Sequence, residues 1–204
     1  MADRKHMTAF GRSIPAAALT APMALAAPFA MATPIAFAAL AAAMMTMSGC
    51  DDRASADVAK INVGGKNFFL ELALTSEKRF RGLSDRTSID PDGGILFVFP
   101  DSQVTVQGFV MRDCPIPIDI IYLDSAGRVL AMHEMKAEPP RDPAKGEGTP
   151  ADANNVAYNS RLKQWSSRYP SQYVIELAGG TIKTLKLKEG DQIAIDPEFK
   201  KRTR

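Results

Sequence analysis

Cysteine and histidine are scarce in this chain, which limits the chemistry that it can support. Two cysteines, Cys50 and Cys114, and two histidines occur among 204 residues. So few cysteines exclude a disulfide framework. His133 has no second histidine, cysteine or carboxylate at the spacing of metal ligands, which is typical of a structural residue. We therefore expect no metal site and no cofactor.

The chain also lacks an excess of either positive or negative charge. The chain holds 25 Lys and Arg residues against 23 Asp and Glu residues. Residues 1–49 contain three of the basic residues and one of the acidic residues, so the remainder is neutral. A neutral chain lacks the broad positive surface that binds nucleic acid, and we expect no nucleic-acid partner. The basic tail of residues 198–204 is interpreted as a solvated end.

Charge is absent altogether from residues 13–49, which are rich in Ala and Met and follow Arg4, Lys5 and Arg12. This layout is typical of an export signal, although a transmembrane helix is the alternative. Four prolines divide the stretch, and the longest run without proline, residues 35–47, has the length of a signal core. The pattern favours a signal peptide.

The end of this stretch carries a second signal. Ser48 and Gly49, directly before Cys50, resemble the cleavage box of bacterial lipoproteins. Residues 1–49 would then be a lipoprotein signal peptide, Cys50 the lipidated residue, and residues 50–57 a polar tether. We predict an exported protein whose lipidated Cys50 anchors it to the outer face of the cytoplasmic membrane.

The remaining residues, 58–197, have the length of one domain with one core. Short apolar runs predict strands at 58–63, 68–74, 95–99, 104–110, 118–123, 128–135, 172–178 and 192–196. Thr75 or Ser76 can cap a short helix that continues to Phe80 and ends at Gly82. This count predicts an α+β, mainly β fold: a compact β-rich single domain with one or two short helices. It would be a partly open barrel or a pair of twisted antiparallel sheets.

Residues 93–127 organise this domain, because they contain three of its strands. Gly108 marks a bulge in the second strand. A polar knot, residues 111–115, precedes the third strand, and Pro115 and Pro117 keep its exit extended. Within the knot, Arg112 and Asp113 have opposite effects on a thiolate at Cys114, so we interpret Cys114 as a buried apolar filler.

Three arginines lie in the predicted helix or shortly after it: Arg79, Arg81 and Arg86. They either form a solvated helix face or pair with buried carboxylates. The candidate carboxylates are Glu71, Asp119 and Glu176. Asp119 lies on a strand whose two faces are largely apolar. Because an unpaired buried carboxylate is costly, we predict an ion pair between Asp119 and one of the three arginines.

Residues 137–155 are rich in Pro, Gly and charged residues, which predicts a long exposed loop. The loop is either a functional lid or an insertion. Tyr158, Trp165 and Tyr169 follow it and would either line a groove or pack the loop against the domain.

Six blocks in order resemble the prokaryotic domain-of-unknown-function family 192. They are residues 71–73, 79–86, 93–99, 111–120, 174–180 and 188–193. The resemblance extends over residues 61–196. It implies a compact β-rich fold, frequent export and no established reaction.

The sequence contains no array of nucleophile and base. We predict a non-catalytic binding or accessory module of the cell envelope, with an unknown small-molecule or protein ligand. The alternative is a hydrolase or other enzyme that acts on an envelope glycan or small polar substrate. Its candidate residues are Asp119, Asp113, Glu176 and His133, with Asp119 and Glu176 as the acid/base pair if about 5–10 Å separates them.

Overall fold

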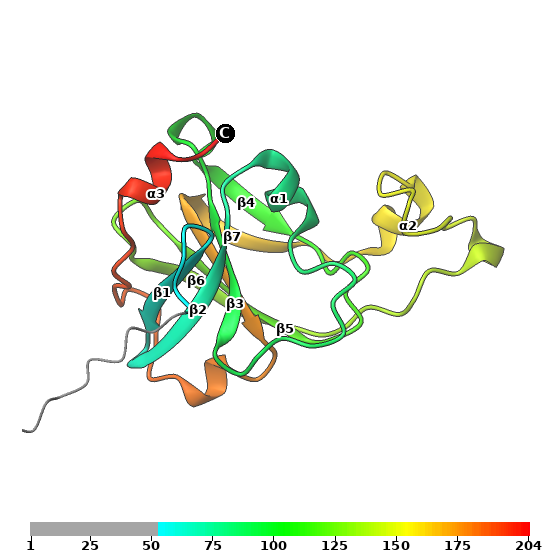
Figure 1. Cartoon of the computed structure of the whole chain (residues 1–204). Coiled ribbons are helices and arrows are strands. Elements are labelled where there is room, and N and C mark those ends of the chain that lie inside the picture. Colours follow the sequence, from blue (N-terminus) through cyan, green and yellow to red (C-terminus); the bar gives the residue numbers. More distant parts are fainter. Residues whose placement is uncertain (1–52) are drawn as a thin grey trace, which may run out of the picture. The chain divides into compact units, whose positions relative to one another are not determined.

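The computed structural model describes residues 53–204, so the predicted signal peptide and Cys50 lie outside the described residues. Figure 1 shows a body of strands with short helices at its margins. No helix within residues 53–204 has the length and apolarity needed to cross a bilayer.

The described residues form a six-stranded and a two-stranded sheet. The larger sheet has the order β1 (Val58–Val63), β2 (Lys66–Ala73), β3 (Gly93–Val98), β8 (Tyr173–Ala178), β5 (Ile118–Leu123), β6 (Val129–Met135). The smaller sheet pairs β4 (Thr105–Phe109) with β7 (Trp165–Ser171). All neighbouring strands are antiparallel except β2 and β3. The predicted α+β, mainly β class is confirmed, as open sheets rather than a closed barrel.

The helices are short. They are α1 (Ser76–Arg81), α2 (Val156–Arg161) and α3 (Glu198–Lys201), with single 3-10 turns η1 (Asp101–Gln103), η2 (Pro143–Lys145) and η3 (Ile182–Thr184). α1 has the predicted ends: the Thr75 hydroxyl accepts from the Lys78 N–H at 3.2 Å, and Gly82 follows with φ 52°. That backbone conformation favours glycine, and it turns the chain back towards the sheet.

Each face of the larger sheet has its own core. The first core is covered by the segment after β8, through Ile182, Leu185, Leu187, Ile195 and Phe199. The second lies under the knot, the small sheet and the end of α1, and it includes Leu83, Phe97, Met111, Cys114, Ile120 and Tyr122. Apolar residues on both sides explain why β3, β5 and β8 read as nearly continuous apolar runs, interrupted only by Asp119 in β5 and Glu176 in β8.

Two strand predictions need correction. Residues 192–196 form no strand, and Gln192 makes only an isolated bridge with Arg128. β7 was not predicted, because its sequence WSSRYPS lacks an apolar alternation. It forms because β4 offers a partner, with Thr105 opposite Ser171 and Phe109 opposite Trp165. The register of this pair shifts next to Gly108, as the predicted bulge requires.

Candidate functional site

Asp119 and Glu176 do not form the acid/base pair that the enzyme alternative needs. Between β5 and β8, Asp119 lies opposite Leu177, and Ile120 lies opposite Glu176. Residues directly opposite in an antiparallel pair share a face, whereas successive residues alternate. The two carboxyl groups therefore point to opposite faces of the sheet, and that prediction is wrong.

The predicted ion pair of Asp119 with an arginine is also wrong. Asp119 is 1% exposed, and its Oδ2 accepts a hydrogen bond of 2.7 Å from the backbone N–H of Ile182 at the start of η3. Burial raises the pKa of Asp119, and the N–H groups of Ile182 and Gly180 oppose that rise. The arginines cannot reach it, because Gly82, at the end of their helix, lies against Phe97 and Glu176 on the other face.

One of the arginines does find a carboxylate. The guanidinium of Arg86 donates two hydrogen bonds, of 2.6 and 2.7 Å, to the two oxygens of Glu71. This fork holds the pKa of Glu71 below its usual range. Arg79 instead donates to the main-chain carbonyls of Leu74 and Val98. Of the two alternatives for these arginines, Arg86 thus pairs with a carboxylate, although the two side chains are half-exposed rather than buried.

Asp113 and His133 have structural partners. The carboxylate of Asp113 accepts two hydrogen bonds of 2.8 Å from Arg141, and the two side chains are 11% and 5% exposed. The hydrogen bonds from Arg141 are the main reason why the pKa of Asp113 is lowered. Nε2 of His133 lies 2.8 Å from the carbonyl oxygen of Ser166, and its ring packs on Trp165 at 5.4 Å. His133 is thus the structural residue that we expected.

The long segment between β6 and β7, residues 136–164, forms an arm that projects from the sheets (Figure 1). Arg141 and Arg161 lie over the ring of Tyr158 at 3.9 and 4.8 Å. Arg161 also binds Glu147, whose side chain is 3% exposed. The hydroxyl of Tyr158 accepts from the N–H of Asp113 at 2.9 Å. Part of the predicted exposed loop is therefore an ordered clamp that holds the knot, and the ring of Tyr158 packs it against the domain.

A small pocket of about 160 Å³ opens between α1, the knot and β8. We call it the inner pocket. Its apolar walls come from Phe80, Phe97 and Phe109, and its polar groups come from Glu176, Ser84 and Arg79, Arg81 and Arg112. Gly82 borders it closely, since a Cβ at that position would stand 3.3 Å from the ring of Phe97 and 3.7 Å from Oε2 of Glu176, and its φ of 52° disfavours other residues.

Glu176 is the most unusual residue of this pocket. It is 5% exposed, and no hydrogen bond or ion pair joins its carboxyl group to another of the residues 53–204. Its oxygens open into the pocket, since Nε1 of Trp165 is the only fully buried side-chain nitrogen or oxygen without a partner in these residues. Burial raises the pKa of Glu176 to about 8. A carboxyl group with that pKa is mostly protonated at neutral pH and can donate a hydrogen bond. A carboxyl group that opens into a pocket and has no partner in the protein is a candidate for ligand contact.

Two arginines of the inner pocket, Arg81 and Arg112, lack carboxylate partners within residues 53–204, whereas Arg79 donates to oxygens of Leu74, Val98, Gln103 and Arg204. Among the ion pairs of residues 53–204, none involves Arg79, Arg81 or Arg112. Arg112 stacks on the ring of Phe80 at 4.0 Å and donates to the carbonyl of the same residue. Arg81 is exposed and lines the pocket. With Glu176 protonated, the inner pocket has a positive charge.

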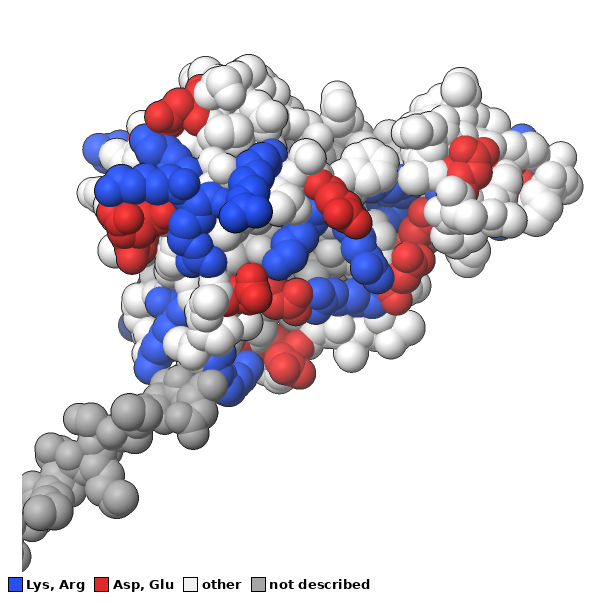
Figure 2. All heavy atoms as spheres, turned by 45° about the horizontal axis from the view of Figure 1, so that its top comes forward, with Lys and Arg blue, Asp and Glu red and all other residues white. Residues whose placement is uncertain are grey.

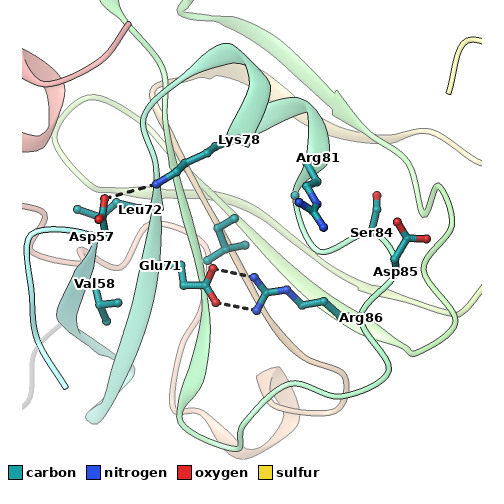
Figure 3. Close-up of a pocket in the computed structure, with 11 residues that line it drawn as sticks. Asp57, Val58, Glu71, Leu72, Lys78, Arg81, Ser84, Asp85 and Arg86 are labelled. Carbon is teal, nitrogen blue, oxygen red and sulfur yellow. Dashed lines mark hydrogen bonds and ion pairs between the residues drawn. The ribbon is translucent and has the colours of Figure 1, made fainter. Parts of the chain in front are cut away.

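A larger hollow of about 540 Å³ adjoins the inner pocket and shares Arg81, Gly82 and Ser84 with it. We call it the outer hollow. Figure 3 shows the Glu71–Arg86 fork on one side of it, the Lys78–Asp57 pair on another, and Arg81 beside Ser84. Acidic and basic side chains are interleaved over the face seen in Figure 2. The outer hollow therefore offers paired donors and acceptors rather than one sign of charge.

Neither Cys114 nor Tyr122, which lie near Glu176, is an activated nucleophile. Burial, with a smaller effect of Glu176, raises the pKa of the Cys114 thiol to about 12, so the thiolate is scarce. The interpretation of Cys114 as a buried filler is confirmed, since it is 7% exposed within the second core. Tyr122 donates to the carbonyl of Trp165 at 2.7 Å, and burial raises its pKa as well.

Comparisons with known proteins give a family and a fold. The chain is similar to a proposed transcription regulator from Sinorhizobium meliloti 1021, with 26% identity, 69% of this chain and 97% of that chain covered, and a TM-score of 0.50. It is also similar to a protein of unknown function from Novosphingobium aromaticivorans DSM 12444, with 24% identity, 68% and 84% covered, and a TM-score of 0.49. No curated protein matches the sequence.

The family match agrees with the residue blocks that first suggested it. The model of the family DUF192, described as Uncharacterized ACR, matches residues 59–195, which is more than half of the chain and nearly all of its two sheets. The chain therefore belongs to the DUF192 family.

Proposed function

We propose that this protein is an exported binding module, tethered to the outer face of the cytoplasmic membrane through Cys50, and that the inner pocket is its ligand site. The leader of residues 1–49 and the box before Cys50 support the tether. The buried, unpartnered carboxyl group of Glu176 is the observation that carries the ligand site.

Binding is favoured over catalysis by the partners of the candidate residues. Asp113 and His133 are held by Arg141 and by the Ser166 carbonyl, and Asp119 lies on the opposite face from Glu176. Glu176 alone cannot supply both members of an acid/base pair. The acidic side chains interspersed among the basic ones on the face seen in Figure 2 favour a small ligand over a nucleic acid.

The ligand site can be tested with a fragment library and backbone-amide NMR spectra of the protein. Fragments that bind should shift the amide signals of Gly82, Ser84 and Glu176, which line the inner pocket. The amides of Gly127 and Arg128, at the turn between β5 and β6, serve as an internal control. Binding of every active fragment at other places would contradict the proposal.

The tether is tested separately by fractionation of cells that express the full chain. Wild-type protein should lose residues 1–49 and sediment with membranes, because several acyl chains on Cys50 would anchor it firmly. Cys50→Ser should leave a soluble or unprocessed protein, and Cys114→Ser is the matched control. A processed, membrane-bound Cys50→Ser variant would show that the box is not used.

A further inference from the structure

We propose that the inner pocket binds the carboxylate of a small hydroxylated acid of the sugar-acid class, and that Glu176 stays protonated and donates a hydrogen bond to this carboxylate. This inference rests on the proposed function, since it specifies the ligand of the same site. It is carried by three features of the site: a buried acid without a partner, two arginines, Arg81 and Arg112, without a carboxylate partner, and a polar hollow next to them.

The arginines determine the sign of the ligand's charge. Arg81 and Arg112 line the inner pocket with donor groups that no carboxylate of the described residues occupies. A guanidinium presents parallel N–H groups that match the two oxygens of a carboxylate. An anionic ligand would supply the negative charge that Arg81 and Arg112 lack as a partner within the described residues.

Glu176 determines how deep the anion can reach. As an ionised group it would repel a carboxylate, whereas as an acid it donates a hydrogen bond and leaves its other oxygen as an acceptor. The titratable and charged groups around it are Cys114, Asp113 and Arg112 from the knot, Tyr122 from β5, His133 from β6, Glu71 from β2, and Arg79 and Arg81 from α1. The two anions among them are neutralised by their own arginines, Asp113 by Arg141 and Glu71 by Arg86. A bound carboxylate would favour the protonated form of Glu176 further.

The outer hollow indicates the size and the hydroxyl groups of the rest of the ligand. Its volume of about 540 Å³ lies within the range of small-molecule sites. The Glu71–Arg86 fork and the Lys78–Asp57 pair line it, and their side chains are 38% to 74% exposed. Such pairs keep free donors and acceptors that hydroxyl groups can use. Because Arg81 and Ser84 border both spaces, one ligand can place its carboxylate in the inner pocket and its hydroxyl groups in the outer hollow.

Calorimetric titration with three probes tests the ligand class. Glucuronate carries the carboxylate and the hydroxylated body, acetate carries the carboxylate alone, and glucose carries the body alone. We expect glucuronate to bind most tightly, acetate weakly, and glucose not measurably. Arg81→Gln should weaken glucuronate binding about fivefold or more, a loss of about 1 kcal/mol. Arg128→Gln, at the distant turn between β5 and β6, is the matched control and should bind as the wild type does.

The pH dependence tests the role of Glu176. Since glucuronate remains ionised above about pH 5, the wild-type affinity should fall about tenfold from about pH 7 to about pH 9, as Glu176 loses its proton. Glu176→Gln keeps a donor at this position at every pH. We expect this variant to bind glucuronate at both pH values within about twofold of the wild-type affinity at about pH 7.

Each contrary result has a definite meaning. If glucose binds as tightly as glucuronate, the site does not recognise the carboxylate of the ligand. If Glu176→Gln loses affinity at both pH values, Glu176 does not act as a hydrogen-bond donor to the ligand. Binding of glucosamine but not glucuronate at this site would also overturn the inference, while the proposal of a ligand site at the inner pocket would stand. Fragments that all bind elsewhere would overturn both.

Discussion

Replacement of Glu176 by Gln should make the free energy of unfolding less dependent on pH. The folded protein holds a proton on Glu176 up to about pH 8, whereas a glutamate in the unfolded chain releases it near its ordinary pKa of 4.5. Because the folded state binds the additional proton, stability is greatest below the unfolded pKa and is lost as pH rises through the folded pKa. The wild type should lose on the order of 3–5 kcal/mol over this window through Glu176 alone.

Gln has nearly the shape of Glu but carries no charge. Glu176→Gln should therefore unfold at nearly the wild-type urea concentration at about pH 5, and should be more stable by on the order of 3–5 kcal/mol at about pH 9. This is a large effect for a domain with a total stability of about 5–15 kcal/mol. Urea unfolding curves at several pH values, with tryptophan fluorescence as the signal, measure it.

The matched control is Glu189→Gln, since Glu189 is half-exposed and pairs with Arg168 at the surface. Its unfolding free energy should follow the wild-type curve between about pH 6 and about pH 9, because surface pairs contribute only about 0–1 kcal/mol. If the curves of the wild type and of Glu176→Gln remain parallel over the same range, Glu176 is ionised in the folded protein, and its role as a buried acid is refuted.

Two further substitutions test the structural roles of the other carboxylates. Arg141→Gln removes the partner of the nearly buried Asp113, so the unfolding free energy should fall by about 3 kcal/mol. Hydrogen exchange should accelerate over residues 136–164. Lys145→Gln, at an exposed position of the same arm, should change neither the unfolding free energy nor the exchange rates. If Arg141→Gln leaves hydrogen exchange in the arm unaltered, the arm does not act as a clamp. Asp119→Ala removes the acceptor for the Ile182 N–H and should cost about 1–2 kcal/mol in a urea melt. A loss above about 3 kcal/mol would instead fit a charged partner.

Local patterns account for most of the elements in the larger sheet. Strands with nearly continuous apolar runs, such as Ile118–Leu123, are recognisable because both faces are buried. The cap at Thr75 and the end at Gly82 follow from side-chain and backbone preferences over a few residues. The bulge beside Gly108 belongs to the same class of local signal.

Such local patterns do not predict β7 or the ordered structure of the arm. Trp165–Ser171 is a strand because β4 supplies its hydrogen-bond partners, and its own residues alternate poorly. The segment 137–155 has the composition of a loop, yet Arg141 reaches Asp113, which lies 28 residues earlier in the chain. Contacts over such distances leave no periodic signal in the sequence.

The sequence by itself determined the class of fold and the family, since these depend on local propensity, on apolar patterning and on short motifs. The tether stays a prediction from such a motif. The sequence also identified Glu176 as a candidate. Only the tertiary structure decided what surrounds that residue. The register of β5 against β8 separates Glu176 from Asp119, and the turn at Gly82 brings the arginines of α1 to the same face as Glu176. A buried carboxyl group titrates according to its neighbours in space, and a linear sequence does not specify those neighbours.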